Sequence, residues 1–421
     1  MVSENNSMDH KPLFSVIVPT RNRAHLLQHA LQSIQDQTFD DYELIVSDNC
    51  SEDKTAEVIR ECAPRATYIR PSQTLAMPDH WEFALEHARG RYVAYLCDDD
   101  VWAPTALARA CQTIAESDSK LVVLFSGLYH APDWLQPDLR NVAIFRPNSG
   151  GVQEKASDDT LRTLFHRCNV INEAPRMLNS FCERETLRRI REGVGNRIFL
   201  LCPDYSFAAY VLAELPVWLF IDEPLHLQGV FPEGIGSTQI FNRGEPAREF
   251  EREFKNKLLQ RVPLKTSVVT NLIVETLMMC QEKSPRLAEF QIDWVQYFIS
   301  NWNDTLTLER NGVNVERDKE EFFAVLKQQP SSLREQVEAR IEAAAGISAD
   351  EWARQHPLRS AVRKTINGSS LLSKLESSVR RRNSDAHNAS APQPKALAGE
   401  AAGFSNILEC ARQLPALAYE K

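Results

Sequence analysis

The sequence predicts an α/β protein that begins with a mainly parallel sheet covered by helices and ends in a helical region. Two observations lead to this prediction. From Pro12 to about Ser126, short apolar runs alternate with amphipathic stretches, which is typical of parallel strands joined by right-handed crossover helices. After about residue 242 only helical patterns remain. The expected strands are 14–18, 42–46, 67–69, 91–96 and 121–125, and the expected helices between them are 26–34, 53–62, 79–88 and 105–116.

The rest of the chain is less regular. Residues between Gly127 and Gly151 are rich in Pro, Asn and Asp and predict an insertion or a long active-site loop. We expect a flexible N-terminus at 1–10, a first domain at 11–240, a helical domain at 241–358, and a basic amphipathic segment with a flexible tail at 359–421. Further helices are expected at 158–167, 183–192, 204–214, 245–261, 266–281, 286–302, 316–328, 333–345 and 349–355, with a strand at 217–220.

Composition excludes several classes of protein. With 43% hydrophobic and 25% charged residues, the 421-residue chain is not wholly disordered. It has only 15 glycines and no G-x-G-x-x-G motif, which argues against a dinucleotide-binding enzyme. A net charge of −9 makes nucleic acid an unexpected partner. Nine cysteines without a C-x-x-C pair indicate reduced thiols. We therefore expect a cytoplasmic protein, at most peripheral to the inner face of the cell membrane.

The densest chemical signal is Cys97-Asp98-Asp99-Asp100, directly after the strand at 91–96. Adjacent carboxylates repel one another unless a cation lies among them, and hard oxygen ligands suit Mg²⁺ or Mn²⁺. The alternative is a solvated acidic turn before the helix at 105–116. Because ligands bind at the carboxyl ends of strands in such sheets, the position favours a metal.

Polar residues also follow the first two strands. Pro19-Thr20-Arg21-Asn22-Arg23 follows the first, and Ser47-Asp48-Asn49 follows the second. Backbone groups and Thr20 suit a nucleoside, an arginine suits phosphate, and Asp48 suits a base or a ribose hydroxyl. Taken alone, Asp48 is more typical of an Asx turn. Polar loops on successive strand ends nevertheless predict a combined pocket.

These motifs resemble family 2 glycosyltransferases of the GT-A fold. The resemblance rests on 14–23, Gln37-Thr-Phe39, 42–49 with Ser51, and 90–104, and it covers roughly residues 12–115 in register. It implies an inverting transfer from a nucleotide-diphosphate sugar to a hydroxyl of a glycan, a lipid-linked or a protein acceptor, in surface polysaccharide or glycoconjugate synthesis. Matched positions imply nucleoside contacts at Thr20 and Asp48, a ribose or sugar contact at Asp98, and a metal ligand at Asp99. We expect Pro19 and Arg21 to contact the same donor molecule and Asp100 to be a second metal ligand.

One departure from the family concerns the metal. Many members have Asp where this chain has Cys97, so the resemblance implies a weakened dependence on metal. A catalytically silent scaffold that binds nucleotide-sugar or glycan is therefore the alternative function. A phosphatase with an aspartyl nucleophile would need an Asp after the first strand, and a nucleotidyltransferase would need a glycine-rich loop there, and both are absent.

The resemblance also implies a general base near the start of a late helix, where Pro203-Asp204-Tyr205 lies. The alternative is that Asp204 only caps this helix. His226 matches a position near the diphosphate, although a histidine beside leucines is more often a core residue. Asn179 is a further donor-loop candidate. Trp81 and Met77 could line the nucleotide pocket, although packing is their default explanation.

The segment at 359–383 is basic, with Leu371, Leu372, Leu375 and Val379 on one helical face. Such a helix suits an anionic membrane surface. A solvated basic helix that leads into a flexible tail is the alternative.

Overall fold

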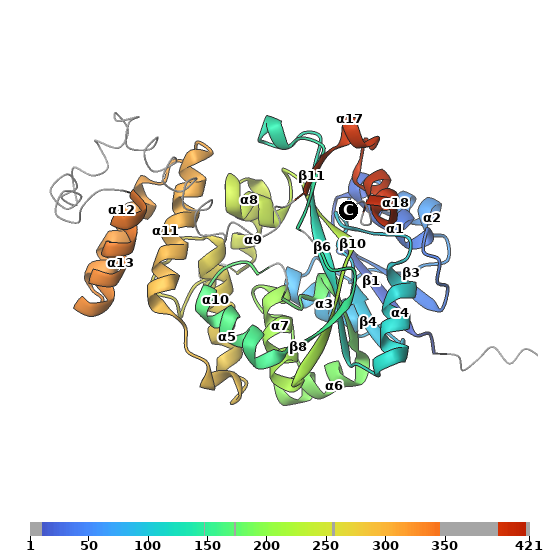
Figure 1. Cartoon of the computed structure of the whole chain (residues 1–421), viewed down its shortest axis with the longest axis horizontal. Coiled ribbons are helices and arrows are strands. Elements are labelled where there is room, and N and C mark those ends of the chain that lie inside the picture. Colours follow the sequence, from blue (N-terminus) through green and yellow to red (C-terminus); the bar gives the residue numbers. More distant parts are fainter. Residues whose placement is uncertain (1–10, 147, 172–173, 255–256, 346–394, 418–421) are drawn as a thin grey trace, which may run out of the picture.

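The computed structural model describes residues 11–146, 148–171, 174–254, 257–345 and 395–417. A single twisted sheet runs through the middle of the described chain and has helices on both faces (Figure 1). The predictions for residues 1–10, for the helix at 349–355 and for the basic segment at 359–383 concern residues outside these ranges.

The first half of the sheet is parallel, as the sequence predicts. Its strands are β1 (Phe14–Thr20), β2 (Tyr42–Asp48), β3 (Thr67–Ile69) and β4 (Tyr92–Tyr95), and their spatial order is β3-β2-β1-β4. Thr20 is in register with Asp48 at the ends of β1 and β2. The loops that leave these strands therefore begin side by side.

The second half of the sheet is mixed. β9 (Ser180–Glu183) runs antiparallel between β4 and β6 (Leu121–His130), while β10 (Val217–Val230) runs parallel to β6. The expectation of an irregular loop between Gly127 and Gly151 was wrong in part, because β6 pairs there with β7 as a hairpin. Proline and asparagine in the hairpin connection hid this pairing from the sequence pattern. The remaining strands here are β5 (Val101–Trp102), β7 (Val142–Phe145) and β8 (Val152–Ala156).

Helices from the first part of the chain cover both faces of the sheet (Figure 1). One face carries α1 (Ala24–Gln35), α2 (Thr55–Cys62) and α4 (Ala106–Ser117), and the other carries α3 (Met77–Leu85) and α7 (Pro203–Glu214). The apolar stripe of α1 is fully buried, as its spacing predicts. Near α7 lie α5 (Ser157–Arg167) and α6 (Arg184–Gly193), and short 3-10 turns occur at Pro137–Leu139, Met177–Asn179 and Leu287–Glu289.

The helical region packs on α7 through α10 (Val269–Gln281). Ile273, Val274 and Leu277 of α10 belong to the same hydrophobic cluster as the strands of the sheet, so one core runs through both regions. No helix in the described ranges combines the length and the apolar character that a membrane span needs. The other helices are α8 (Ile235–Phe241), α9 (Glu245–Phe254), α11 (Trp294–Arg310), α12 (Glu316–Lys327) and α13 (Ser331–Ala345).

The predicted flexible tail is wrong for residues 395–417. β11 (Lys395–Ala398) pairs antiparallel with β7 and extends the sheet, and α17 (Gly399–Ala402) leads to α18 (Ile407–Leu417). Apolar residues recur at helical spacing along α18, and Cys410, Ala411 and Leu414 are buried against α1, β5 and β10. This stripe is short, and the Ala- and Ser-rich composition around it hid it from the sequence reading.

Candidate functional site

Three loops meet at the carboxyl ends of β1, β2 and β4. The backbone N–H of Asn49 donates to the carbonyl of Thr20 at 2.9 Å, which ties the first two loops together. The hydroxyl of Thr20 donates to Asp98 Oδ2 at 2.8 Å, which ties the first loop to the third. Sequence reasoning expected a combined pocket here, and the structure does bring Thr20, Asp48 and Asp98 together.

Asp48 is fully buried beneath the second loop. Its Oδ1 accepts from the Ser51 N–H at 2.8 Å, and its Oδ2 accepts from Tyr68 at 2.7 Å and from Arg70 at 2.6 Å. Burial acts to raise the pKa of Asp48, but these donors and the Arg70 charge hold it below the usual range. The bond from the Ser51 N–H to the Asp48 side chain is of the kind that the alternative prediction, an Asx turn, expects. Asp48 therefore stabilises its own loop, whether or not it also binds a ligand.

The acidic loop is tied to the first loop by Arg23. Its Nη1 lies 3.0 Å from Asp98 Oδ1 and 3.2 Å from Asp99 Oδ2, so one guanidinium faces two of the three carboxylates. Arg21 points elsewhere and pairs with Glu249 at 2.9 Å and Glu253 at 3.4 Å on α9. Its assignment to substrate therefore stays a prediction, as does that of Pro19, which is buried in β1.

Asp100 is held by β10 rather than by the first loop. Its Oδ2 lies 3.2 Å from His226 Nε2, and its Oδ1 accepts from the Gly229 N–H at 2.9 Å. His226 is fully buried, and its Nδ1 lies 2.7 Å from the Ser126 hydroxyl. A side chain at Gly229 would place its Cβ 2.0 Å from the Asp99 carbonyl, so glycine lets β10 approach the acidic loop. His226 is both a satisfied core residue and a contact of the site.

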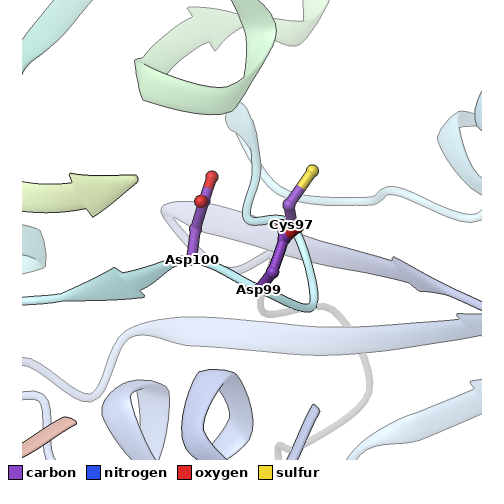
Figure 2. A group of neighbouring side chains, drawn as sticks. All are labelled: Cys97, Asp99 and Asp100. Atoms are coloured by element: carbon purple, nitrogen blue, oxygen red, sulfur yellow. The ribbon is translucent and has the colours of Figure 1, made fainter. Parts of the chain in front are cut away.

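Cys97, Asp99 and Asp100 could hold a cation. One ligand atom from each lies within 4.8 Å of the others, and the three side chains point to the same side of the loop after β4 (Figure 2). Burial raises the pKa of Asp99 to about 8, helped by Asp98 and Asp100 and opposed by Arg23. Burial and the neighbouring aspartates raise the pKa of the Cys97 thiol well above its usual range. The carboxylates fit Mg²⁺ or Mn²⁺, whereas a protonated thiol is a poor ligand for either.

Asp204 lies in the first turn of α7. Cys202 occupies the cap position, and Asp204 Oδ1 is buried without a hydrogen-bond partner in the described chain. Burial raises its pKa to about 6, while Arg176 acts to lower that pKa and Asp100 to raise it. A carboxylate without a capping bond, near Asp100, fits a proton acceptor better than it fits a cap.

The remaining candidates from the sequence are packing residues. The Asn179 amide donates to the carbonyls of Leu124 and Ala174. Trp81 stacks on Tyr95 with ring centroids 4.9 Å apart, and Met77 packs against the same core at the start of α3.

Sequence reasoning missed several residues near the site. The His80 ring lies 2.8 Å from the Ser47 hydroxyl beside Asp48, and burial lowers its pKa to about 4. Thr276 of α10 accepts from the Cys202 N–H, two residues before Asp204. Arg176 is buried near Asp204. No local motif marks them, because distant segments bring them to the site.

Comparison with known proteins agrees with the motifs. Residues 15–171 match the model of glycosyl transferase family 2. The putative teichuronic acid biosynthesis glycosyltransferase TuaG of Bacillus subtilis is 32% identical over 111 residues, which are 25% of this chain and 43% of TuaG. A GalNAc(5)-diNAcBac-PP-undecaprenol beta-1,3-glucosyltransferase of Campylobacter jejuni is 38% identical over 109 residues, which are 25% of this chain and 35% of that protein. The chain thus spans less than half of these two curated relatives.

Among solved structures, that of S. aureus TarS 1-349 covers 87% of this chain and 91% of its own at 16% identity, with a TM-score of 0.45. A TM-score below 0.5 is too low to establish a shared fold, so the assignment rests on the sequence match and on the architecture of the sheet. The matched segment contains β1 to β4 and the acidic loop. Residues 15–171 therefore belong to glycosyl transferase family 2, as the motifs of the three loops predict.

Proposed function

We propose that this chain is an inverting glycosyltransferase that moves a sugar from a nucleotide-diphosphate sugar to an acceptor hydroxyl. One observation supports this most directly: Asp204, a half-buried carboxylate whose Oδ1 is buried without a hydrogen-bond partner in the described chain, lies near the acidic loop that follows β4. The family match of residues 15–171 agrees with a glycosyl transfer. The reaction needs a base on one side of the sugar and stabilisation of the leaving group on the other.

In the proposed reaction, Asp204 takes the proton of the acceptor hydroxyl. The hydroxyl oxygen then forms a bond to the anomeric carbon, while the bond from that carbon to the diphosphate breaks and the leaving nucleoside diphosphate keeps the electron pair. Thr20 and Asp48, with Pro19 and Arg21 beside them, would contact the nucleoside, and Asp98 would contact the ribose or the sugar. The three loops lie at one edge of the sheet, so one donor molecule can reach all of them.

A divalent cation, Mg²⁺ or Mn²⁺, would be held by Asp99 as principal ligand and by Asp100. Bound there, it would neutralise negative charge on the leaving diphosphate. The raised pKa of Asp99 supports this assignment, because a carboxylate in a crowded acidic loop is stabilised by a nearby cation. His226 and the Gly229 N–H hold Asp100 in place from β10.

The names of relatives point to the acceptor class. TuaG is named for teichuronic acid biosynthesis, and the putative glycosyl transferase WcaA of Escherichia coli is named for colanic acid biosynthesis. The Campylobacter enzyme is named for GalNAc(5)-diNAcBac-PP-undecaprenol. We therefore propose a role in surface polysaccharide or glycoconjugate synthesis, in the cytoplasm at the inner face of the membrane. The segment at 359–383 would supply the peripheral membrane contact.

The proposal is tested with a panel of nucleoside diphosphates, with and without Mn²⁺. A ligand that binds the native state raises its melting temperature by mass action, so the best stabiliser identifies the base. The matching nucleotide sugars are then assayed for release of nucleoside diphosphate. Asp99→Ala should abolish transfer while the fold, read by circular dichroism, stays intact. Turnover that is unchanged in this variant after metal chelation would contradict the metal assignment.

Cys97 favours a second candidate function, a silent scaffold that binds nucleotide-sugar or glycan. The raised pKa of its thiol leaves the position without a charged ligand at neutral pH. The same assay separates the two functions: a scaffold gains stability with the nucleotide but releases no diphosphate from any nucleotide sugar. An enzyme shows both effects.

A further inference from the structure

Among the residues that the structure describes, Arg176 is a buried cation without a charged partner. Its side chain is 3% exposed, and its Nη2 donates to Gln228 Oε1 at 3.2 Å. Its Nε is buried and has no hydrogen-bond partner in the described part of the chain. Within the described ranges, no carboxylate lies at ion-pair distance from its guanidinium. Burying an arginine in this way is costly unless an anion compensates the charge.

The backbone holds Arg176 in one position. Its N–H donates to the Ala174 carbonyl at 2.8 Å, and its own carbonyl accepts from the Asn179 N–H at 3.2 Å and from the Ser180 hydroxyl at 2.5 Å. These bonds anchor the residue at the start of the 3-10 turn that leads into β9. The backbone of Arg176 is therefore fixed before any ligand arrives, and the Gln228 contact orients its guanidinium.

The neighbours of Arg176 are residues of the candidate site. Gln228, which it contacts, precedes Gly229, whose N–H donates to Asp100. Burial raises the pKa of Asp204, and Arg176 is close enough that its charge acts against this rise. The guanidinium thus lies near both the acidic loop and the start of α7. Arg21, Arg23 and Arg70 already pair with carboxylates, so Arg176 differs from the other arginines near the loops.

We propose that Arg176 binds an oxyanion of the substrate, a phosphate or a carboxylate, beside Asp204. This inference rests on the proposed function. A guanidinium presents a planar set of N–H donors that matches either group with two parallel hydrogen bonds, and the Nε of Arg176 has no partner among the described residues. Two sources fit this chemistry, namely the diphosphate of the donor and an acidic group on the sugar or the acceptor. A neutral sugar would leave the buried charge uncompensated.

The test compares charged probes with their neutral counterparts in the full chain at pH 8. Inorganic pyrophosphate, UDP and GDP are paired with uridine and guanosine, and methyl β-glucuronide is paired with methyl β-glucoside. Arg176→Met should lower the affinity of the protein for at least one charged probe by about tenfold or more and leave its affinity for the neutral counterpart unchanged. Arg176→Lys should keep part of the affinity for the charged probe. Loss of pyrophosphate and nucleotide affinity identifies the donor diphosphate, and loss of glucuronide affinity identifies an acidic sugar or acceptor.

A second variant keeps the test valid if Arg176→Met fails to fold. Gln228→Glu places a carboxylate next to the Arg176 guanidinium, where it can pair with the buried charge. This variant should therefore raise the melting temperature and lower the affinity for the same charged probe, whereas Gln228→Met should change neither quantity. The proposal is overturned if wild type binds no charged probe, or if both the Arg176 and the Gln228→Glu variants keep wild-type affinities. Wild type that binds pyrophosphate or glucuronide but no nucleoside diphosphate would contradict the proposed function and not the role of Arg176. If the Arg176 variants bind every charged probe as wild type does and change only the pH profile of sugar transfer, Arg176 adjusts the pKa of Asp204 and does not bind an oxyanion, which would also overturn the proposal.

Discussion

At the scale of single residues, environment decides what each carboxylate of the site can do. Asp48 is surrounded by donors that lower its pKa, whereas burial and neighbouring carboxylates raise the pKa of Asp99 to about 8 and that of Asp204 to about 6. Residues of one type are thus divided into an ionised anchor and groups that favour a nearby cation or a proton. Two substitutions test this division.

Cys97→Asp should strengthen the binding of Mg²⁺ and Mn²⁺. The variant replaces a protonated thiol with a carboxylate beside Asp99 and Asp100, and oxygen is the preferred ligand of both ions. We expect affinity to rise about tenfold, measured by calorimetric titration of Mn²⁺ into the protein with the stabilising nucleoside diphosphate. Cys111→Asp, which alters a half-buried thiol of α4, is the matched control. Equal affinity in wild type and Cys97→Asp would argue against a cation at this loop.

Asp204→Asn should remove activity and add stability at alkaline pH. The pKa of this carboxyl is higher in the folded chain, about 6, than its ordinary value of about 3.9. Between about pH 4 and pH 6 the Asp204 carboxyl is therefore protonated in the native state but ionised in the unfolded state. Above pH 6 the ionised carboxylate is buried on folding, which lowers the stability, whereas below pH 4 the carboxyl is neutral in both states and has no such effect. With a chelator present to remove metal ions, the free energy of unfolding of the variant should exceed that of wild type at pH 8 by up to about 3 kcal/mol. At pH 4 the two free energies of unfolding should be equal.

Denaturant unfolding at both pH values checks the stability of Asp204→Asn. Transfer should fall by about 10²- to 10⁴-fold, and the wild-type rate should itself decline as pH falls below 6. A variant that is destabilised at pH 8 would instead support the capping role.

At the scale of elements, the C-terminal helix α18 completes the face of the sheet that carries α1. Cys410, Ala411 and Leu414 are buried, and Arg412 pairs with Asp36 at the end of α1 at 2.7 Å. The helix is far in sequence from the strands it covers, and β11 attaches the same segment to the sheet edge. Its contribution should therefore appear in the stability of the first domain.

Leu414→Ala should destabilise the protein by about 2–4 kcal/mol, because it removes a side chain that is 1% exposed and leaves a cavity. Thermal and denaturant unfolding provide the measurement. Arg412→Ala on the same helix, which breaks a half-exposed ion pair with Asp36, should cost about 1 kcal/mol or less. Equal small losses in both variants would show that α18 does not pack on the sheet in solution.

At the scale of the whole molecule, the helical region contributes to the site as well as to the core. α10 packs on α7, and its Thr276 hydroxyl accepts from the Cys202 N–H at 3.0 Å. Cys202 is the cap residue of α7 and precedes Asp204 by two positions. The helical region therefore sets the start of the helix that carries the proposed base.

Thr276→Val should lower the turnover of sugar transfer with little change in donor affinity. The substitution keeps the shape of the side chain but leaves the Cys202 N–H without its acceptor, at a cost of about 1–3 kcal/mol in stability. Steady-state kinetics on the active nucleotide sugar gives the two quantities separately. Thr276→Ser, which keeps the hydroxyl, should behave nearly as wild type. Loss of donor affinity with unchanged turnover would place the role of Thr276 elsewhere.

Taken by itself, the sequence determined the parallel half of the sheet, the helices around it and the three polar loops. These features are local. A buried strand appears in the sequence as a short apolar run, and a packed helix appears as apolar residues at helical spacing. The point where an apolar run ends before the next helix marks the carboxyl end of a strand, where ligands bind in such sheets. Only the tertiary structure decided what surrounds each loop residue. The acidic loop and the start of α7 are contacted by residues from segments far apart along the chain, namely Arg23, His226, Gly229, Arg176 and Thr276. Such contacts leave no periodic pattern in the local sequence. The same reason explains the tail, where burial of α18 depends on a sheet face that a reading of residues 395–417 alone does not contain.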